Sequence, residues 1–123
     1  MVIVEFLVSI RVELPAEFDD ERRAALLAAE AARAAELAAA GRLVRLWRVP
    51  GRLANRGIWE AADATVLHAA LTSLPLWPWM EIDVEPLACH PSDPLARARD
   101  GDESLSRDVR KQRSRSGSQR ATA

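Results

Sequence analysis

One acidic residue of this sequence, Glu30, falls on a face of its predicted helix that is otherwise apolar. A straight helix turns about 100° per residue, and on that wheel Glu30 falls within an apolar stripe that includes Leu26 and Leu37. A carboxylate on a buried face must pair with a cation, take up a proton or face a cavity. Burial raises its pKa, which suits a general base that acts on a carbon acid. Glu30 is therefore the candidate catalytic residue, and the alternative is a structural carboxylate held by Arg45 or Arg48.

Cationic side chains that suit an anionic substrate cluster further along the chain, at Arg45, Arg48, Arg52 and Arg56. A guanidinium group binds a carboxylate through two parallel hydrogen bonds, so Arg45, Arg48 and Arg52 are candidate anchors for such a substrate. Arg45 and Arg48 are three residues apart on a predicted strand, so their side chains should face opposite sides of the sheet. Asn55 is a further candidate, because its amide can bind a carbonyl group. The alternatives are ordinary surface or interface arginines and a turn role for Asn55.

Other kinds of chemistry find little support in the residue types. Cys89 is the only cysteine, and the two histidines form no Cys/His cluster, so we expect neither a disulfide nor a metal site. The sequence also lacks a Gly-rich phosphate loop and a Ser/His/Asp constellation. His68 has apolar or small neighbours at helical spacing, which predicts that it packs in the interior.

Hydrophobic periodicity predicts the elements that position these residues. Alternation over residues 2–14 indicates a strand with one buried face. An Ala-rich stretch without Pro or Gly predicts a helix over residues 21–40, with Asp19 or Asp20 as its N-cap and Gly41 as its C-cap.

The rest of the folded region also shows the hydrophobic patterns of strands and a helix. Residues 43–49 and 53–60 predict a hairpin of two strands. A short helix over 63–73, a loop over 75–79 and a strand over 80–87 follow. The order β-α-β-β-α-β predicts an α+β, ferredoxin-like fold with both helices on one face of an antiparallel sheet, which leaves the other face for a second copy.

Composition divides the chain into two regions. We expect residues 1–92 to form one domain and residues 93–123 to form a disordered polar tail, because the tail holds few large aliphatic residues to offset its ordering entropy. Acidic residues interrupt the arginines of the tail, so we expect no nucleic-acid partner. The first residues resemble neither a signal peptide nor a membrane span, and we expect a cytoplasmic protein with no membrane partner.

Five stretches together resemble the muconolactone isomerase family. They are VSIRVELP at residues 8–15, LWR at 46–48, the G-x-x-AN pattern at 51–55, LPLWPWMEIDVEPL at 74–87 and CHPS at 89–92. No single piece is specific, but their order and spacing match without a large gap over about 90 of the 123 residues.

The resemblance implies a fold of the dimeric α/β-barrel type that pairs through its sheets, assembles into decamers and needs no cofactor. It also implies an isomerase of aromatic catabolism, which converts muconolactone to the 3-oxoadipate enol-lactone by a 1,3-proton transfer. Glu30 stands where this family has an acidic residue in its first helix and would shuttle the proton. Arg48 or Arg52 would hold the carboxylate of the substrate, and Asn55 its lactone carbonyl.

Several positions depart from the family pattern. Leu27 stands where the family typically has Lys, Arg45 and Arg52 where it has His, and Leu53 where it has Tyr. These departures leave two alternatives open. One is a related lactone enzyme that eliminates chloride from a chlorinated muconolactone, and the other is a non-catalytic ferredoxin-like oligomer that binds a small acid.

Overall fold

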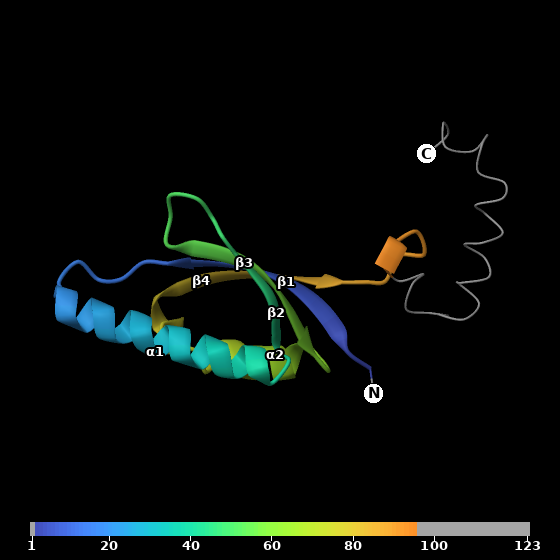
Figure 1. The fold of residues 1–123 in the computed structure, drawn as a ribbon, viewed down its shortest axis with the longest axis horizontal. Helices are drawn as coiled ribbons and strands as arrows, with labels where there is room; N and C mark the ends of the chain where they lie inside the picture. Colours follow the sequence, from blue (N-terminus) through green and yellow to red (C-terminus); the bar gives the residue numbers. More distant parts are fainter. Residues whose placement is uncertain (1, 96–123) are drawn as a thin grey trace. The chain divides into compact units, whose positions relative to one another are not determined.

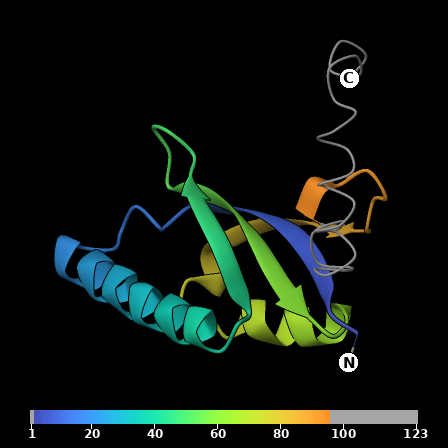
Figure 2. The same cartoon turned by 45° about the vertical axis from the view of Figure 1, so that its right-hand side comes forward.

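The computed structural model describes residues 2–95, in which a four-stranded antiparallel sheet carries two helices on one face (Figure 1). The elements are, in order, β1 (Val4–Val12), α1 (Asp20–Ala39), β2 (Leu43–Arg48), β3 (Ala54–Ala61), α2 (Ala64–Thr72), the 3₁₀ turn η1 (Trp77–Trp79) and β4 (Met80–Leu87). The strand order is β2-β3-β1-β4. This confirms the predicted ferredoxin-like α+β fold, and Figure 2 shows that the second face of the sheet carries neither helix.

The chain divides after Ala88 into two units, and the first unit holds every helix and strand named above. The predicted domain boundary at residue 92 stays a prediction, and the predicted disordered tail falls mainly on residues 96–123, outside the described part of the chain. Within residues 2–95, no helix is long and apolar enough to cross a membrane.

β1 lies at the centre of the sheet and defines its two faces. Phe6, Val8 and Ile10 are almost fully buried beneath the helices, and we call their side the helix face. Residues of the opposite parity, such as Ser9 and Arg11, lie on the other side, which we call the open face. The register carries this division across the sheet, because partners in a ladder share a face. The predicted alternation is confirmed, although the strand is shorter at both ends than the pattern suggested.

α1 is a regular helix with strong helix-forming residues, but few of its side chains are buried. The Asp19 carboxylate caps its first turn by accepting a hydrogen bond from the Arg22 amide at 2.8 Å. The C-cap is Ala40, and Gly41 takes the left-handed position that follows, with φ +79°. The predicted C-cap, Gly41, thus lies one residue beyond the observed C-cap. Ala40 still has helical dihedral angles, and glycine is favoured only at the next position, where φ is positive. Leu37 is the one fully buried residue of α1.

The β2–β3 hairpin turns at Gly51, whose φ of +75° suits a residue without a Cβ. A register shift between Leu43 and Arg45 resets the pairing, so that Arg45 lies opposite Ile58 and Arg48 opposite Asn55. Ile58 and Asn55 are three residues apart on β3 and face opposite sides of the sheet. Because ladder partners share a face, Arg45 and Arg48 also face opposite sides, as predicted.

α2 begins after the Asp63 side chain, which accepts a hydrogen bond from the Val66 amide, and it buries Leu67, Ala70 and Leu71. His68 is exposed, so the prediction of an interior histidine was wrong: it lies on the solvent side of the helix that turns those three residues inward. The predicted loop before β4 contains the 3₁₀ turn η1.

Candidate functional site

Glu30 is half-buried on the inward side of α1, as the helical wheel predicted. Its Oε1 accepts a hydrogen bond from the backbone amide of Leu76 at 3.0 Å. Burial raises the pKa of the Glu30 carboxyl above its ordinary value, and the Leu76 hydrogen bond opposes this rise to a smaller extent. No arginine pairs with Glu30 among the described residues, so the alternative of a carboxylate held by Arg45 or Arg48 is not what the structure contains.

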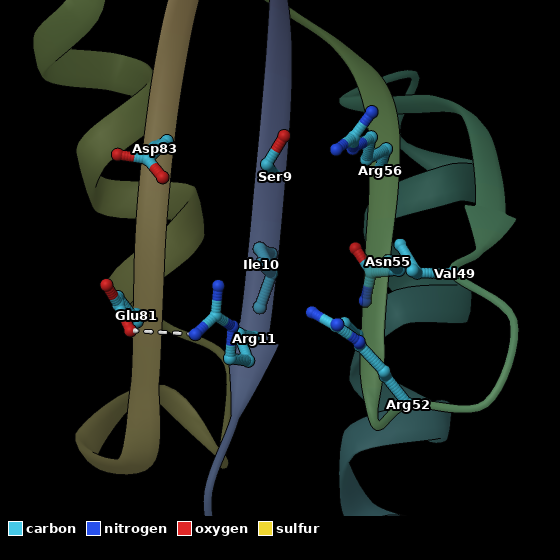
Figure 3. A pocket seen from close by; sticks show the side chains of 10 residues that line it. Ser9, Ile10, Arg11, Val49, Arg52, Asn55, Arg56, Glu81 and Asp83 are labelled. Atoms are coloured by element: carbon cyan, nitrogen blue, oxygen red, sulfur yellow. Dashed lines mark ion pairs between the residues drawn. The ribbon is translucent and has the colours of Figure 1, made fainter.

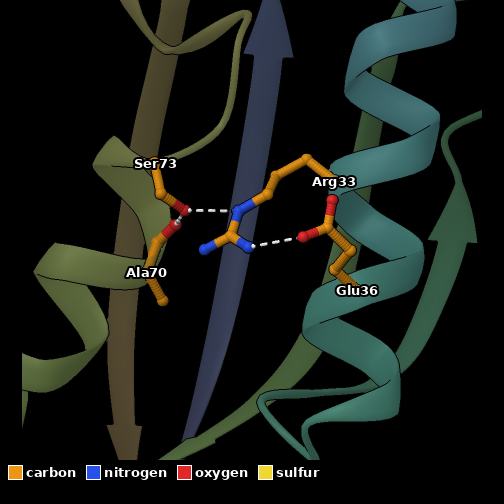
Figure 4. Close-up of polar contacts among 4 residues, drawn as sticks. All are labelled: Arg33, Glu36, Ala70 and Ser73. Atoms are coloured by element: carbon orange, nitrogen blue, oxygen red, sulfur yellow. Dashed lines mark hydrogen bonds and ion pairs between the residues drawn. The ribbon is translucent and has the colours of Figure 1, made fainter.

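A second contact ties α1 to the end of α2, one turn beyond Glu30. Arg33 Nε donates to Ser73 Oγ at 3.0 Å, and its Nη1 contacts Glu36 Oε2 at 3.2 Å (Figure 4). Ser73 Oγ in turn donates to the Ala70 carbonyl at 2.6 Å. These contacts hold the start of the segment that presents the Leu76 amide, so α1 and the α2–β4 connection are fixed relative to each other at the site.

Arg48 and Asn55 lie on the same side of the sheet as Glu30. The register sets Arg48 opposite Asn55 on the helix face. Arg48 is exposed, and Asn55 is half-buried.

The other predicted anchors lie apart from Glu30. Arg52 extends over the open face, where it lines a groove of about 90 Å³ together with Arg11, Arg56, Glu81 and other residues (Figure 3). Asn55 also lines this groove. Arg45 stacks on Trp47 with 4.6 Å from its guanidinium carbon to the ring centroid. Arg48 and Asn55 thus lie on the helix face by the strand register, whereas Arg45 and Arg52 lie on the open face.

Two contacts at the site and one buried core residue escaped the sequence reasoning. The Leu76 amide is a backbone group, and residue types carry no signal for it. The Arg33–Ser73 contact joins residues 40 positions apart. Trp59 is 2% exposed on the helix face. It lies four residues after Asn55 on β3, so the alternation of side chains along a strand could have predicted that both face the same side.

The fold and this site define a small α+β protein in which burial raises the pKa of one carboxyl group among the described residues, that of Glu30. Within residues 2–95, no three His, Cys, Asp or Glu side chains lie close enough to hold a metal ion.

Comparisons with known proteins assign the family. The muconolactone delta-isomerase family model matches residues 4–93. The chain is 37% identical over 87 residues to a muconolactone delta-isomerase of Pseudomonas aeruginosa, covering 71% of this chain and 91% of that protein. It is 36% identical over 88 residues to the Rhodococcus opacus enzyme, covering 72% and 95%. A crystal structure of muconolactone isomerase matches with a TM-score of 0.69 and 36% identity, over 73% of this chain and 94% of that one. The protein belongs to the muconolactone delta-isomerase family.

The raised pKa of Glu30 predicts a pH dependence of stability. Because the folded protein holds this proton more tightly than the unfolded chain, the stability linked to Glu30 is complete below about pH 4.5, the ordinary pKa of the group, and is lost as the pH rises through the raised pKa. Glu30→Gln keeps an acceptor for the Leu76 amide but cannot ionise. We expect urea unfolding at successive pH values to show that the variant gains stability relative to the unaltered protein as the pH rises. Glu21→Gln, on the exposed first turn of α1, serves as control and leaves the slope unchanged; a parallel course for Glu30→Gln contradicts the prediction.

Proposed function

We propose that this protein isomerises muconolactone, shifting the double bond of the unsaturated lactone by a 1,3-proton transfer through Glu30. The observation that carries the proposal is a half-buried carboxylate of raised pKa, without a cationic partner among the described residues, in a chain that spans 91 to 95% of the length of the two muconolactone delta-isomerases named above. A cytoplasmic location suits an enzyme of aromatic catabolism and the exposed free Cys89.

The reaction needs one group that takes a proton and returns it. The Glu30 carboxylate removes a proton from a ring carbon, and the electrons of the broken C–H bond pass into the conjugated lactone to form a dienolate. The carboxylic acid so formed then gives the proton to the carbon two bonds away, and the charge returns to Glu30. A base with a raised pKa binds the proton more strongly, which favours its removal from carbon. The Leu76 amide fixes the carboxylate in place during both steps.

The carboxymethyl arm of the substrate requires a cation near the mouth of the site. Arg48 suits this role best, because it lies on the helix face of the sheet and its side chain is exposed. Asn55, directly opposite Arg48, offers its amide to the lactone ring. Arg52 and Arg45 face the open side and are better placed to act between subunits.

The open face is suited to self-pairing, because its charges are separated. β4 presents Glu81, Asp83 and Glu85, whereas the β2–β3 side presents Arg45 and Arg56, with Glu60 further along β3. A two-fold axis that runs along the strands sets β4 of each copy over β2 and β3 of the other, so that acidic and basic edges meet. The register places Asp83 and Arg56 in the same row on either side of Ser9. We therefore include a sheet-to-sheet dimer in the proposal, as the unit from which a decamer would be built.

The first test removes the base. Glu30→Gln is expected to lower kcat by about 10²-fold or more, since it cannot accept a proton. The measurement follows the butenolide absorbance of muconolactone with purified protein, and Glu21→Gln serves as the matched control. Equal rates for Glu30→Gln and the unaltered protein would remove Glu30 from the mechanism. No turnover by the unaltered protein, with chloride released from a chlorinated muconolactone instead, would replace the proposed reaction with the elimination.

The second test separates the arginines. Arg48→Gln is expected to raise KM by about tenfold or more with little change in kcat, because a charge-assisted hydrogen bond to a non-reacting carboxylate is lost. Arg45→Gln and Arg52→Gln, measured at a protein concentration that keeps the oligomer intact, should leave KM unchanged. A rise in KM for Arg52→Gln alone would move the anchor to the open face.

The third test addresses the dimer. Asp83→Arg is expected to shift the protein toward the monomer in sedimentation equilibrium, because two arginines then meet across the interface. Combining Asp83→Arg with Arg56→Asp restores opposite charges and should restore the dimer. Glu36→Arg, a charge reversal on the exposed side of α1, serves as control. A double variant that remains as dissociated as Asp83→Arg is evidence against this pairing.

A further inference from the structure

Two polar atoms are enclosed in the helix face of β3 without a hydrogen-bond partner. Among the described residues that are not exposed, the buried side-chain atoms of this kind are Asn55 Oδ1 and Trp59 Nε1. Most buried polar groups in folded proteins have a partner, because an unpaired donor or acceptor keeps the full cost of losing water. Two such atoms on one strand, on one face, therefore call for a chemical explanation.

The two atoms flank Gly57, and the backbone there is shaped around the indole of Trp59. The indole nitrogen lies 3.4 Å from the place where a Cβ on Gly57 would lie, so the ring folds back along β3 over Gly57 in the direction of Asn55. The same Cβ would come within 2.7 Å of the Arg45 carbonyl oxygen. Gly57 thus permits close pairing with β2. The Leu46 side chain lies beside the indole nitrogen, because its Cδ1 is 3.0 Å from the same Cβ position.

The chemistry of the two side chains is complementary to an oxygen atom with growing charge. The indole nitrogen can only donate. The Asn55 amide can turn by half a rotation, which exchanges its oxygen for an NH₂ group at the same position. Each side chain can then donate a hydrogen bond to an oxygen atom of the substrate. The pair lies on the helix face of the sheet, where Asn55 is directly opposite Arg48.

The proposed reaction creates such an acceptor. When Glu30 removes the proton, negative charge collects on the carbonyl oxygen of the lactone, and Arg48 is engaged by the carboxymethyl arm. Leu27, one turn before Glu30, is apolar and 41% exposed and offers no donor. A buried donor that is unpaired before the substrate arrives can stabilise this oxygen without first giving up another partner, which is the condition for preorganised stabilisation.

We propose that Trp59 is a substrate-binding residue whose indole N–H, with the turned amide of Asn55, holds the lactone carbonyl oxygen as the dienolate forms. This inference rests on the proposed function and adds the residue that stabilises the charge. It also assigns the substrate class more narrowly, to lactones whose ring carbonyl can reach the helix face while a carboxylate stays at the rim.

The closing experiment uses the full chain and a substrate analogue that does not react. The probe is saturated carboxymethyl-butyrolactone, which keeps the ring carbonyl and the arm but has no double bond to move. Trp59 is the most buried of the four tryptophans, so its indole ¹⁵N–¹H resonance is identified by slow exchange with water and by its loss in Trp59→Phe. We expect this resonance to move downfield when the analogue binds, whereas the resonance of the exposed Trp47 stays in place.

Kinetics give a second readout. Trp59→Phe keeps an aromatic ring in the core and is expected to lower kcat on muconolactone by about 10²-fold, the usual effect of removing one donor to a developing oxyanion. Trp47→Phe, on the open face, is the matched control and keeps its rate. An unmoved Trp59 resonance under saturating analogue overturns the inference even if Trp59→Phe fails to fold, and so does an unchanged kcat in a folded variant. If the unaltered protein binds the analogue through Trp59 but does not turn over muconolactone, the proposed function fails and the binding role of Trp59 stands.

Discussion

Glu30 loses part of its water when α1 packs against the sheet and the α2–β4 connection, and a single backbone N–H replaces it. This replacement of water by one backbone donor sets both the pKa and the orientation of the Glu30 carboxyl group. Burial makes the carboxylate hold its proton more tightly, while the Leu76 amide keeps the ionised form within reach. A carboxylate paired with an arginine would be a poorer proton acceptor, and a fully solvated one would lack both orientation and enhanced basicity. The intermediate environment suits a group that must take a proton from carbon and then return it.

Other parts of the fold serve to keep that environment in place. The Arg33–Ser73 contact fixes α1 against the end of α2, from which the chain continues to the Leu76 amide. Gly57 allows the hairpin to pair closely while Trp59 fills the space beneath the helix. The two faces of the sheet then have separate tasks. The helix face holds Glu30, the exposed Arg48 and the two unpaired buried atoms Asn55 Oδ1 and Trp59 Nε1, and the open face holds charges suited to a second copy.

The sequence predicted the fold well, because each element has a strong local signal. Alternation marked β1, alanine content marked α1, and β4 was predicted with its observed bounds. The inward facing of Glu30 followed from the 3.6-residue period alone. The predictions that failed or were absent depend on contacts between distant residues. Periodicity cannot show which side of a short helix meets the sheet, so His68 was misplaced. It also cannot show that the partner of Glu30 is a backbone amide 46 residues away.

The light burial of α1 affects how a substrate can reach the base. Half of the residues of this helix are alanine, the strongest helix former, and Leu37 near its C-terminal end is its only fully buried side chain. The helix therefore depends on its own backbone hydrogen bonds more than on packing. Access to Glu30 then requires breaking a few side-chain contacts such as Arg33–Ser73, rather than melting a helical turn.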